Sequence, residues 1–336
     1  MKKLFFLLAC VAMSVLSMGQ VNQLVWANGH LLYGTPIESI DSLTYDEMQD
    51  IDTLHLLLPR TLIKVVHDTV YIHDTVYVET DCGEDIPSAG IGAFSIADGK
   101  QVTFSKGNLQ YHPKNNEWRF ADSQLDYIGG ANSNIAADYD GWIDLFGWGT
   151  GDAPTKSSTS NSDYSTFVDW GTNQIGADAP NTWRTLSKDE WMYIFYDRTN
   201  AQSLFALGSV NGVNGTIILP DNWTTPDGVS FVASTTQGLS WDGSYYYNIN
   251  GNNFSHNTYT AEQWQTMEQA GAVFLPASGY RGGTDVDTVG DSGYYRSSTE
   301  GNENRAYDVC FMSNYLHPWN SLTRSRGQAV RLAQDL

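Results

Sequence analysis

Positive charge is scarce in this 336-residue sequence, where 18 Lys and Arg residues face 38 Asp and Glu and the formal net charge is −20. Proteins that bind DNA or RNA neutralise phosphates with a cationic surface, so this balance excludes a nucleic-acid partner. Only 17% of the residues are charged, whereas 31 are glycine, 19 tyrosine and 11 tryptophan. This composition disfavours a helical bundle and favours short strands, turns and loops.

Cysteine is also scarce, with three residues in the chain. Cys82 and Cys310 lie far apart and predict either one long-range disulfide or, as we favour, two unpaired thiols. The chain has neither the cysteine spacing of a disulfide scaffold nor a CxxC pair for a metal. We therefore expect no metal and no cofactor.

Long hydrophobic runs are missing outside the N-terminus, so no other segment predicts a membrane span. Residues 1–19, MKKLFFLLACVAMSVLSMG, combine two lysines with thirteen apolar or small residues and end in small residues before Gln20. This pattern predicts a signal peptide cleaved near Gln20 and a protein exported to the cell surface or extracellular space. The alternatives are a membrane anchor, for which the apolar stretch is too short, and lipidation at Cys10, past which that stretch continues.

Residues 20–85 form an acidic segment with twelve acidic and two basic residues. It begins with a predicted pair of short strands around a turn at Asn28-Gly29. A repeat follows, with HDTVY occurring once in His67–Ile72 and again in His73–Val78, and its residues favour extended backbone. Its His and Asp residues could indicate metal ligands, but no third ligand type lies nearby, so an extended stalk or edge strand is the better interpretation.

From residue 86 to the end, the sequence predicts a second, α+β domain with many short strands and two helices. Ser187 and Glu190 match a capping box ahead of an apolar stretch, and Thr260 and Gln263 match another that ends at Gly271. The expected strands are Gln101–Gln110, Glu117–Phe120, Gly215–Leu219, Gly271–Pro276, Gly293–Ser298, Ala306–Met312 and Ala329–Leu332.

Many separate blocks of this region carry a family resemblance. They include FSKGNLQY at residues 104–111, GWIDLFGWG at 141–149, NTWRTL at 181–186, GAVFLPA at 271–277 and AVRL at 329–332. Together they resemble the major-paralogous-domain (FISUMP) family of bacterial envelope proteins and the C-type-lectin-fold variable proteins diversified by retroelements. The resemblance implies a C-type-lectin-like fold, related to formylglycine-generating enzymes, with long loops and a ligand-binding face on its final strands.

The C-terminal segment is rich in residue types that serve recognition. Residues 281–336 hold six of the ten arginines, no lysine, and many tyrosines and asparagines. Such side chains supply rigid aromatic area and planar or adaptable hydrogen bonding. A polar surface without a ligand is the alternative. The expected ligand-binding residues are Arg296, Ser297, Asn302, Asn304, Tyr307, Asp308, Cys310, Ser313, Asn314, Tyr315, His317, Asn320, Ser321, Thr323 and Arg324.

Strand alternation in Ala306–Met312 predicts that Tyr307, Val309 and Phe311 face the core. Asp308, Cys310 and Met312 should then face outward. The resemblance to retroelement-diversified proteins further implies variation across Arg296–Ser325, although the family's usual Trp-Ser-Ser is replaced here by Arg296-Ser297-Ser298.

Catalysis is not expected. A formylglycine-generating type of oxidase needs a reactive cysteine pair, and Cys310 is the only cysteine in the C-terminal half. Asp285, Asp287 and Asp291 resemble a calcium loop loosely but lack a bidentate glutamate at the required spacing. We expect an exported, non-catalytic surface protein or adhesin, associated with the cell envelope, that binds a protein or glycan. A structural envelope or fibre-tip component is the alternative.

Overall fold

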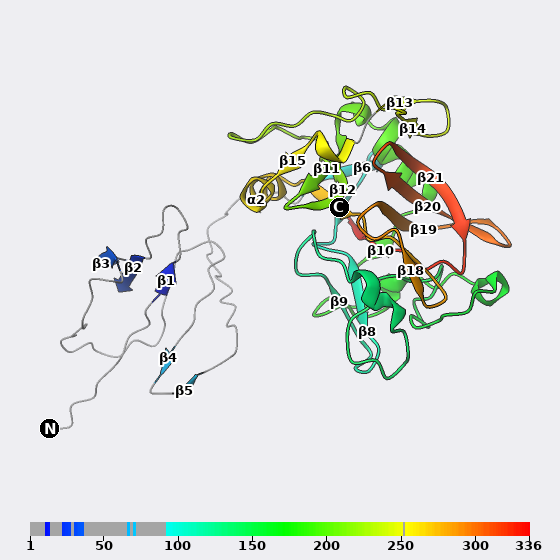
Figure 1. Ribbon diagram of the computed structural model, residues 1–336, viewed down its shortest axis with the longest axis horizontal. Coiled ribbons are helices and arrows are strands. Elements are labelled where there is room, and N and C mark those ends of the chain that lie inside the picture. Colours follow the sequence, from blue (N-terminus) through cyan, green and yellow to red (C-terminus); the bar gives the residue numbers. More distant parts are fainter. Residues whose placement is uncertain are drawn as a thin grey trace. The chain divides into compact units, whose positions relative to one another are not determined.

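The computed structural model describes residues 92–250 and 253–336, together with five strands of the region before residue 92. The chain divides into two compact units, Met1–Ile86 and Pro87–Leu336 (Figure 1). Most of the predicted signal peptide, the second copy of the HDTVY repeat, and Cys10 and Cys82 lie outside the described residues.

The described strands of the first unit form two small antiparallel sheets. One has the order β1-β2-β3, from β1 (Val11–Met13), β2 (Asn22–Ala27) and β3 (His30–Pro36). Ala27 pairs with His30, which confirms the predicted hairpin. The other pairs β4 (Val66–His67) with β5 (Val70–Tyr71), so the first copy of the repeat contributes to a short hairpin.

The second unit is a mixed α+β domain built from three main sheets and two hairpins, as the sequence predicts at this level. The first sheet has the order β10-β22-β7-β6, from β6 (Phe94–Ala97), β7 (Lys100–Phe104), β10 (Arg184–Thr185) and β22 (Leu332–Asp335). The second has the order β15-β11-β12-β16, from β11 (Phe205–Val210), β12 (Val213–Ile218), β15 (Thr258–Tyr259) and β16 (Val273–Pro276).

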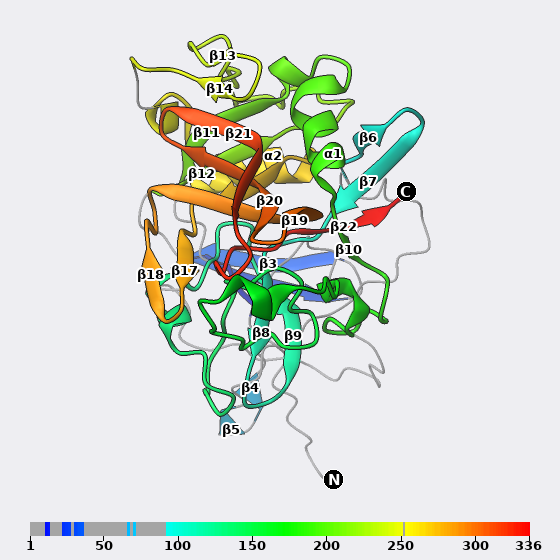
Figure 2. The same ribbon diagram turned by 90° about the vertical axis from the view of Figure 1, so that its right-hand side faces the viewer.

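The third sheet has five strands in the order β13-β14-β21-β20-β19. These are β13 (Ser240–Trp241), β14 (Tyr246–Tyr247), β19 (Ser292–Asn302), β20 (Arg305–Met312) and β21 (Tyr315–Thr323), and the last three run side by side in Figure 2. The hairpins pair β8 (Leu109–His112) with β9 (Glu117–Phe120), and β17 (Tyr280–Gly282) with β18 (Asp285–Asp287).

Both predicted helices are present and begin at the predicted capping boxes. In α1 (Lys188–Met192), Ser187 caps the Glu190 amide and the Glu190 carboxylate accepts from the Ser187 amide. This helix continues as a π-helical turn over Tyr193–Asp197. Thr260 and Gln263 cap α2 (Ala261–Gln269) in the same way. No helix in the described part of the chain is long and apolar enough to cross a membrane.

Short 3₁₀ helices interrupt the loops between these elements. They cover Gly129–Ser133, Asn161–Tyr164, Trp170–Thr172, Ala201–Ser203 and Asn253–Ser255.

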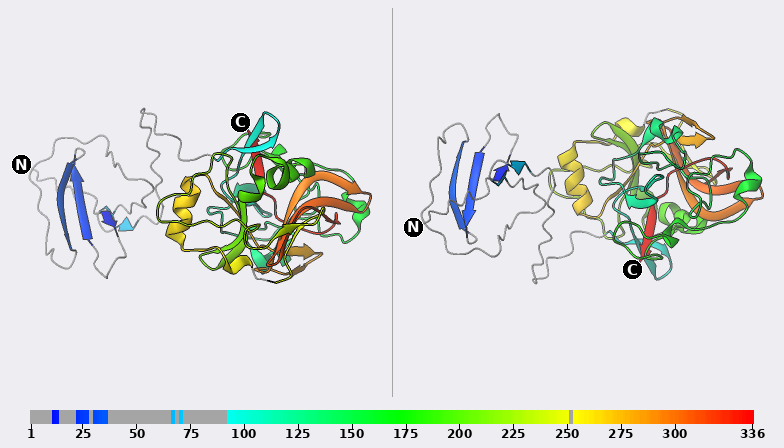
Figure 3. Two further views of the ribbon diagram at one scale, coloured as in Figure 1. Left: turned by 90° about the horizontal axis from the view of Figure 1, so that it is seen from above. Right: turned by 90° about the horizontal axis from the view of Figure 1, so that it is seen from below.

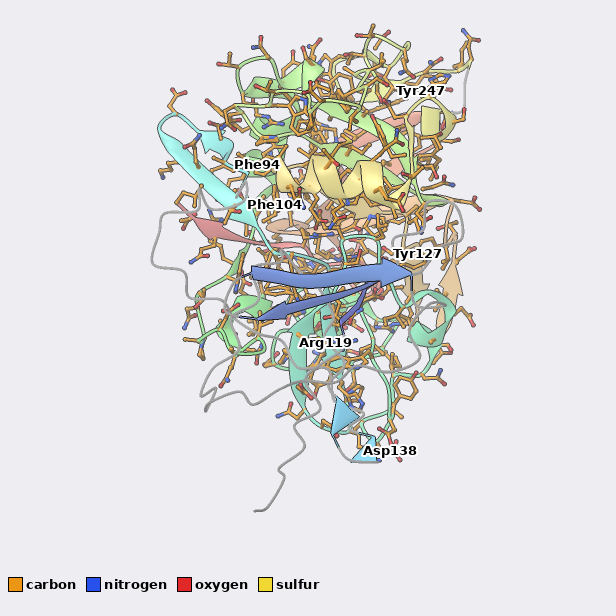
Figure 4. The ribbon with its side chains drawn as sticks, turned by 90° about the vertical axis from the view of Figure 1, so that its left-hand side faces the viewer. Phe94, Phe104, Arg119, Tyr127, Asp138 and Tyr247 are labelled. Atoms are coloured by element: carbon orange, nitrogen blue, oxygen red, sulfur yellow. The ribbon has the colours of Figure 1, made fainter. Side chains whose placement is uncertain are left out.

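Three apolar clusters form the core of the second unit. The largest joins α1, β6, β7 and β11 to one face of the five-stranded sheet, and its Phe94 and Phe104 rings meet edge to face at 5.0 Å (Figure 4). A second cluster lies beneath β8 and β9. The third packs α2 against the sheet of β11, β12 and β16, away from β19–β21 (Figure 3). The burial of Trp264 and Met267 in it follows from the amphipathic spacing of α2.

The strand predictions differ from the structure at several places, since β6, β10, β11, β13, β14, β15, β17 and β18 were not expected either. Gln101–Gln110 is two strands, because the chain bends at Gly107, where an added Cβ would lie 2.5 Å from the Ala121 carbonyl oxygen. The closing strand β22 starts at Leu332, and Ala329 makes only an isolated bridge to Tyr295. No strand was expected over Tyr315–Thr323, which contains Pro318.

The bulge between β20 and β21 explains how Pro318 fits into a strand. The pairing register shifts between Asp308–Asn320 and Cys310–His317, so the ladder is interrupted next to Pro318. Proline cannot donate a ladder hydrogen bond, and bulges are among the few places in a sheet that accept it.

A buried ion pair connects the end of the π-helical turn after α1 to strands β6 and β7 of the first sheet. Arg198 Nη1 donates to Asp221 Oδ1 at 3.0 Å, and the Arg198 side chain is only 1% exposed. Asp221 Oδ2 also accepts from the Ser95 amide, the Ser95 hydroxyl and Gln101 Nε2. Burial raises the pKa of Asp221, but hydrogen bonds from its three partners outweigh this, so the pKa of the carboxyl is lowered.

We predict that Asp221→Asn lowers the free energy of unfolding by about 3 kcal/mol, because Arg198 is left buried without its counter-ion. Asp335→Asn is the matched control, since Asp335 accepts from Arg184 but is 67% exposed, and it should cost less than about 1 kcal/mol. Urea unfolding followed by tryptophan fluorescence measures both. Equal losses would contradict the role of the Arg198 pair. In the wild type, the stabilisation from the Asp221–Arg198 pair is fully present above the pKa that Asp221 has in the unfolded chain. It is lost as the pH falls through the lower pKa that Asp221 has in the folded protein.

Candidate functional site: a tyrosine and histidine cluster on the five-stranded sheet

The five-stranded sheet has one face in the core and one face that carries polar and aromatic side chains. Tyr295, Val309, Phe311 and Leu316 occupy the core face and are fully buried. For Val309 and Phe311 this confirms the alternation expected from the sequence. On the opposite face, register places Cys310 beside His317, and Met312 beside Tyr315.

The middle of this opposite face is itself covered. Asp308 is 1% exposed and accepts from Asn320 Nδ2 at 2.8 Å and from Gln328 Nε2 at 3.2 Å. Burial raises the pKa of the Asp308 carboxyl, which the nearby Arg296 guanidinium and these amides oppose. The expectation that Asp308 and Cys310 face outward is therefore wrong, because Gln328 covers Asp308 and the Tyr315 hydroxyl lies against the Cys310 thiol.

Two arginines expected to bind a ligand instead bind backbone carbonyls. Arg296 is 0% exposed, and its Nη2 donates to the carbonyl oxygens of Thr323, Arg324 and Arg326. Arg324 is 2% exposed and donates to the carbonyl oxygens of Tyr164 and Asn302 and to the Glu300 carboxylate. Ser297 is also buried and donates to the Tyr307 carbonyl.

The predicted site residues thus fall into four groups. The first group was expected to contact a ligand but is buried and has a structural role: Arg296, Ser297, Asp308, Cys310 and Arg324. The group near the β19–β20 turn comprises Asn302, Asn304, Ser321 and Thr323, while Ser313, Asn314, Tyr315 and His317 lie near the β20–β21 turn. Tyr307 and Asn320 lie between these ends and are half-buried.

The two groups at the turns are too far apart to hold one small ligand. β20 spans eight residues, which places its ends about 25 Å apart at roughly 3.4 Å per residue. The structure therefore does not bring the predicted residues into one small site. It brings only the group at the β20–β21 turn together with further aromatic side chains.

Strand β14 pairs with β21 next to the β20–β21 turn (Figure 1). Four aromatic rings gather there. We call Tyr245, Tyr247, Tyr315 and His317 the tyrosine–histidine cluster. The Tyr245 centroid lies 5.7 Å from Tyr247, 6.0 Å from Tyr315 and 5.5 Å from His317. The two tyrosine pairs are T-shaped, with interplanar angles of 81° and 67°. This arrangement leaves Tyr247 39% exposed and the other three rings half-buried.

The charged and titratable neighbours of this cluster are few. Burial lowers the pKa of His317, so its imidazole is neutral at physiological pH, although Asp242 acts in the opposite direction. The Asp242 carboxylate accepts from the amides of Tyr245 and Ser244, and these hydrogen bonds lower its pKa. Asp242 is exposed and ionised at neutral pH, so the cluster carries a fixed negative charge beside neutral rings.

A second aromatic group occupies the other side of the same strands. Tyr196 stacks on Trp241 at 4.4 Å, and Trp241 lies 6.5 Å from Trp319. Lys188 Nζ lies 5.3 Å from the Tyr307 ring and 5.5 Å from the Trp319 ring. Tyr307 was expected in the core and is only half-buried, because it borders this group at the start of α1.

Sequence reasoning missed Tyr245 and Tyr247, which lie more than thirty residues before the recognition-rich segment 281–336. A signal was present, since three tyrosines follow one another at positions 245–247. On a strand, such a run must place its first and third side chains on the face opposite the second. Tyr246 is fully buried in the core, which puts its two neighbours on the ligand-accessible face.

The side chains of the tyrosine–histidine cluster can make non-covalent contacts. Within residues 92–250 and 253–336, no group of three or more His, Cys, Asp or Glu side chains is placed to hold a metal ion. Phenol rings, an imidazole and amides can stack on a ligand and exchange hydrogen bonds with it. Comparison with known proteins adds no assignment: no protein-family model, no curated protein and no solved structure matches this chain.

Arg296→Met should lower the free energy of unfolding by at least about 3 kcal/mol, because three buried carbonyls lose their donor. Arg305→Met, at an exposed arginine that donates to Ser321, should stay within about 0.5 kcal/mol of the wild type. Urea unfolding of both variants makes the comparison. Unchanged stability of Arg296→Met would contradict the structural role of Arg296 and make it a candidate ligand contact again.

The Cys310 thiol should be inert in the folded protein. It is 1% exposed, it lies 3.3 Å from the Tyr315 hydroxyl, and burial raises its pKa. Because the thiolate is the reactive form, we expect Ellman's reagent to label Cys310 only on unfolding. The measurement uses a C10S/C82S variant, so that Cys310 is the single thiol. Rapid labelling without denaturant would show that Cys310 is open to solvent.

Proposed function

We propose that this chain is an exported, surface-presented binding protein that recognises a protein or glycan without catalysing a reaction. Its binding site is the tyrosine–histidine cluster, extended by Ser313 and Asn314 at the β20–β21 turn. The observation that carries this proposal is the grouping of four partly accessible rings, from two segments far apart in sequence, at one edge of one sheet.

A C-type-lectin-like fold is the architecture we propose for the second unit. Two features support it besides the sequence blocks. The unit has two short helices among small twisted sheets and long loops. Its first and last strands also share a sheet, since β22 lies beside β7 and β7 beside β6. A recognition surface on β19–β21 would lie on strands rather than on loops, which suits precise positioning of its side chains.

The composition of the cluster also suits recognition. Tyr side chains bring large contact area at low conformational cost and are enriched where proteins bind partners. Tyr247 and Ile249 are among the few large hydrophobic residues of the described region that are exposed, at 39% and 73%. Grouped exposure of this kind marks interaction sites more often than scattered hydrophobic residues do.

A binding screen with a paired variant tests the proposal. The full chain is screened against glycans and envelope or host proteins, and hits are measured again with Tyr245→Ala/Tyr315→Ala. We expect a loss of at least about 2 kcal/mol, a thirtyfold weakening, because both rings would be central contacts.

Tyr127→Ala is the matched control, since Tyr127 is partly exposed and lies well away from Tyr247 (Figure 4). The control should bind as the wild type does. A ligand whose affinity is the same in the double variant and the wild type would place the site elsewhere. If the screen yields no ligand, the second candidate gains support: a structural envelope or fibre-tip component, suggested by the acidic N-terminal segment.

A further inference from the structure

The tyrosine–histidine cluster has the electrostatics of a cation site. Aromatic rings carry negative charge on their faces, and a cation within about 6 Å of a ring centroid is attracted to it. The Tyr245 ring stands nearly perpendicular to the Tyr247 ring, at 81°, with the two centroids 5.7 Å apart. One cation can therefore lie within reach of both rings. His317 is neutral because burial lowers its pKa, and it therefore does not repel a positive charge.

The surrounding sequence strengthens this field. Residues 199–280 contain no Lys or Arg but five acidic residues, and Tyr315–Thr323 contains no charged residue at all. The Asp242 carboxylate is exposed and lies on the β13–β14 connection beside Tyr245. No positive side chain from β13, β14 or β21 can therefore neutralise Asp242 or occupy the ring faces.

We propose that the cluster binds a Lys- or Arg-bearing segment of a partner protein, with the cationic head on the tyrosine rings beside Asp242. This inference rests on the proposed function and names the ligand class of the same site. Charge complementarity supports this proposal. A chain with a net charge of −20 attracts basic partners at long range, and the Asp242 carboxylate favours a positively charged group in direct contact.

Apolar exposure favours a protein segment over a free cation. Ile249 is 73% exposed two residues beyond Tyr247, and it offers area that an ammonium ion alone cannot cover. The aliphatic stems of Lys and Arg pack on such surface while their charged heads reach a polar or aromatic partner. An anionic glycan would instead meet the repulsion of Asp242.

The test is an NMR titration of the full chain with acetyl-Gly-Lys-Gly-Lys-Gly-amide. A control peptide replaces both lysines by norleucine, which keeps the aliphatic stem and removes the charge. We expect the lysine peptide to shift the Tyr245, Tyr315 and His317 ring signals and to bind at least fivefold more tightly. Asp242→Asn, which keeps the oxygen that accepts from Tyr245, should weaken lysine-peptide binding at least threefold, whereas Tyr127→Ala should leave it unchanged.

Each outcome separates this inference from the proposed function. Equal binding of the two peptides, or no ring shifts up to about 10 mM, would overturn the cation assignment. A neutral glycan whose binding depends on Tyr245 and Tyr315 but not on Asp242 would also overturn it, while leaving the proposed binding site intact. A partner that binds independently of both tyrosines would remove the site itself.

Discussion

Buried arginines that donate to backbone carbonyls hold the second unit together. A domain with two short helices and long irregular connections buries many carbonyls that no ladder satisfies, and each needs a donor. Arg281 donates to the carbonyls of Leu145, Lys156 and Gly283, and Arg331 to those of Ser105 and Phe274. With Arg296 and Arg324, these side chains fasten the loops around the C-terminal segment.

This constraint determines where a ligand can bind. The C-terminal segment covers the polar face of β19 and β20, where Arg296 donates to carbonyls of Thr323–Arg326 and Asp308 accepts from Gln328. Asp308 and Arg296 therefore belong to the interior. On β20, Arg305, Tyr307 and Met312 keep accessible surface, and Met312 pairs with Tyr315, which contacts Tyr245. The buried centre and the accessible edge result from the same packing. Arg296 donates to the carbonyl of Thr323 at the end of β21, and β21 carries Tyr315 and His317.

Local features of the fold could be predicted from the sequence, and features of longer range could not. Both helices begin at their capping boxes because Ser187 and Thr260 satisfy amides within three residues. Strand β21 was missed because Pro318 argues against a strand, and the bulge that accepts it depends on pairing with β20. Val330 and Leu332 are fully buried, but so is Arg331 between them, so alternation alone does not show which of these side chains is exposed.

The candidate site shows the limit of reasoning from composition. Arginine, tyrosine and asparagine serve equally as buried donors and as surface contacts, so their enrichment in residues 281–336 does not tell the two roles apart. The role of such a side chain depends on whether it bonds to backbone carbonyls or is exposed to solvent. That in turn depends on segments far away in the sequence. Arg296 meets carbonyls of the loop at Thr323–Arg326, whereas Tyr315 meets Tyr245 at an open edge. In a chain with this much negative charge, an edge of rings without a lysine or arginine of its own is therefore the place where a basic partner can supply the missing cation.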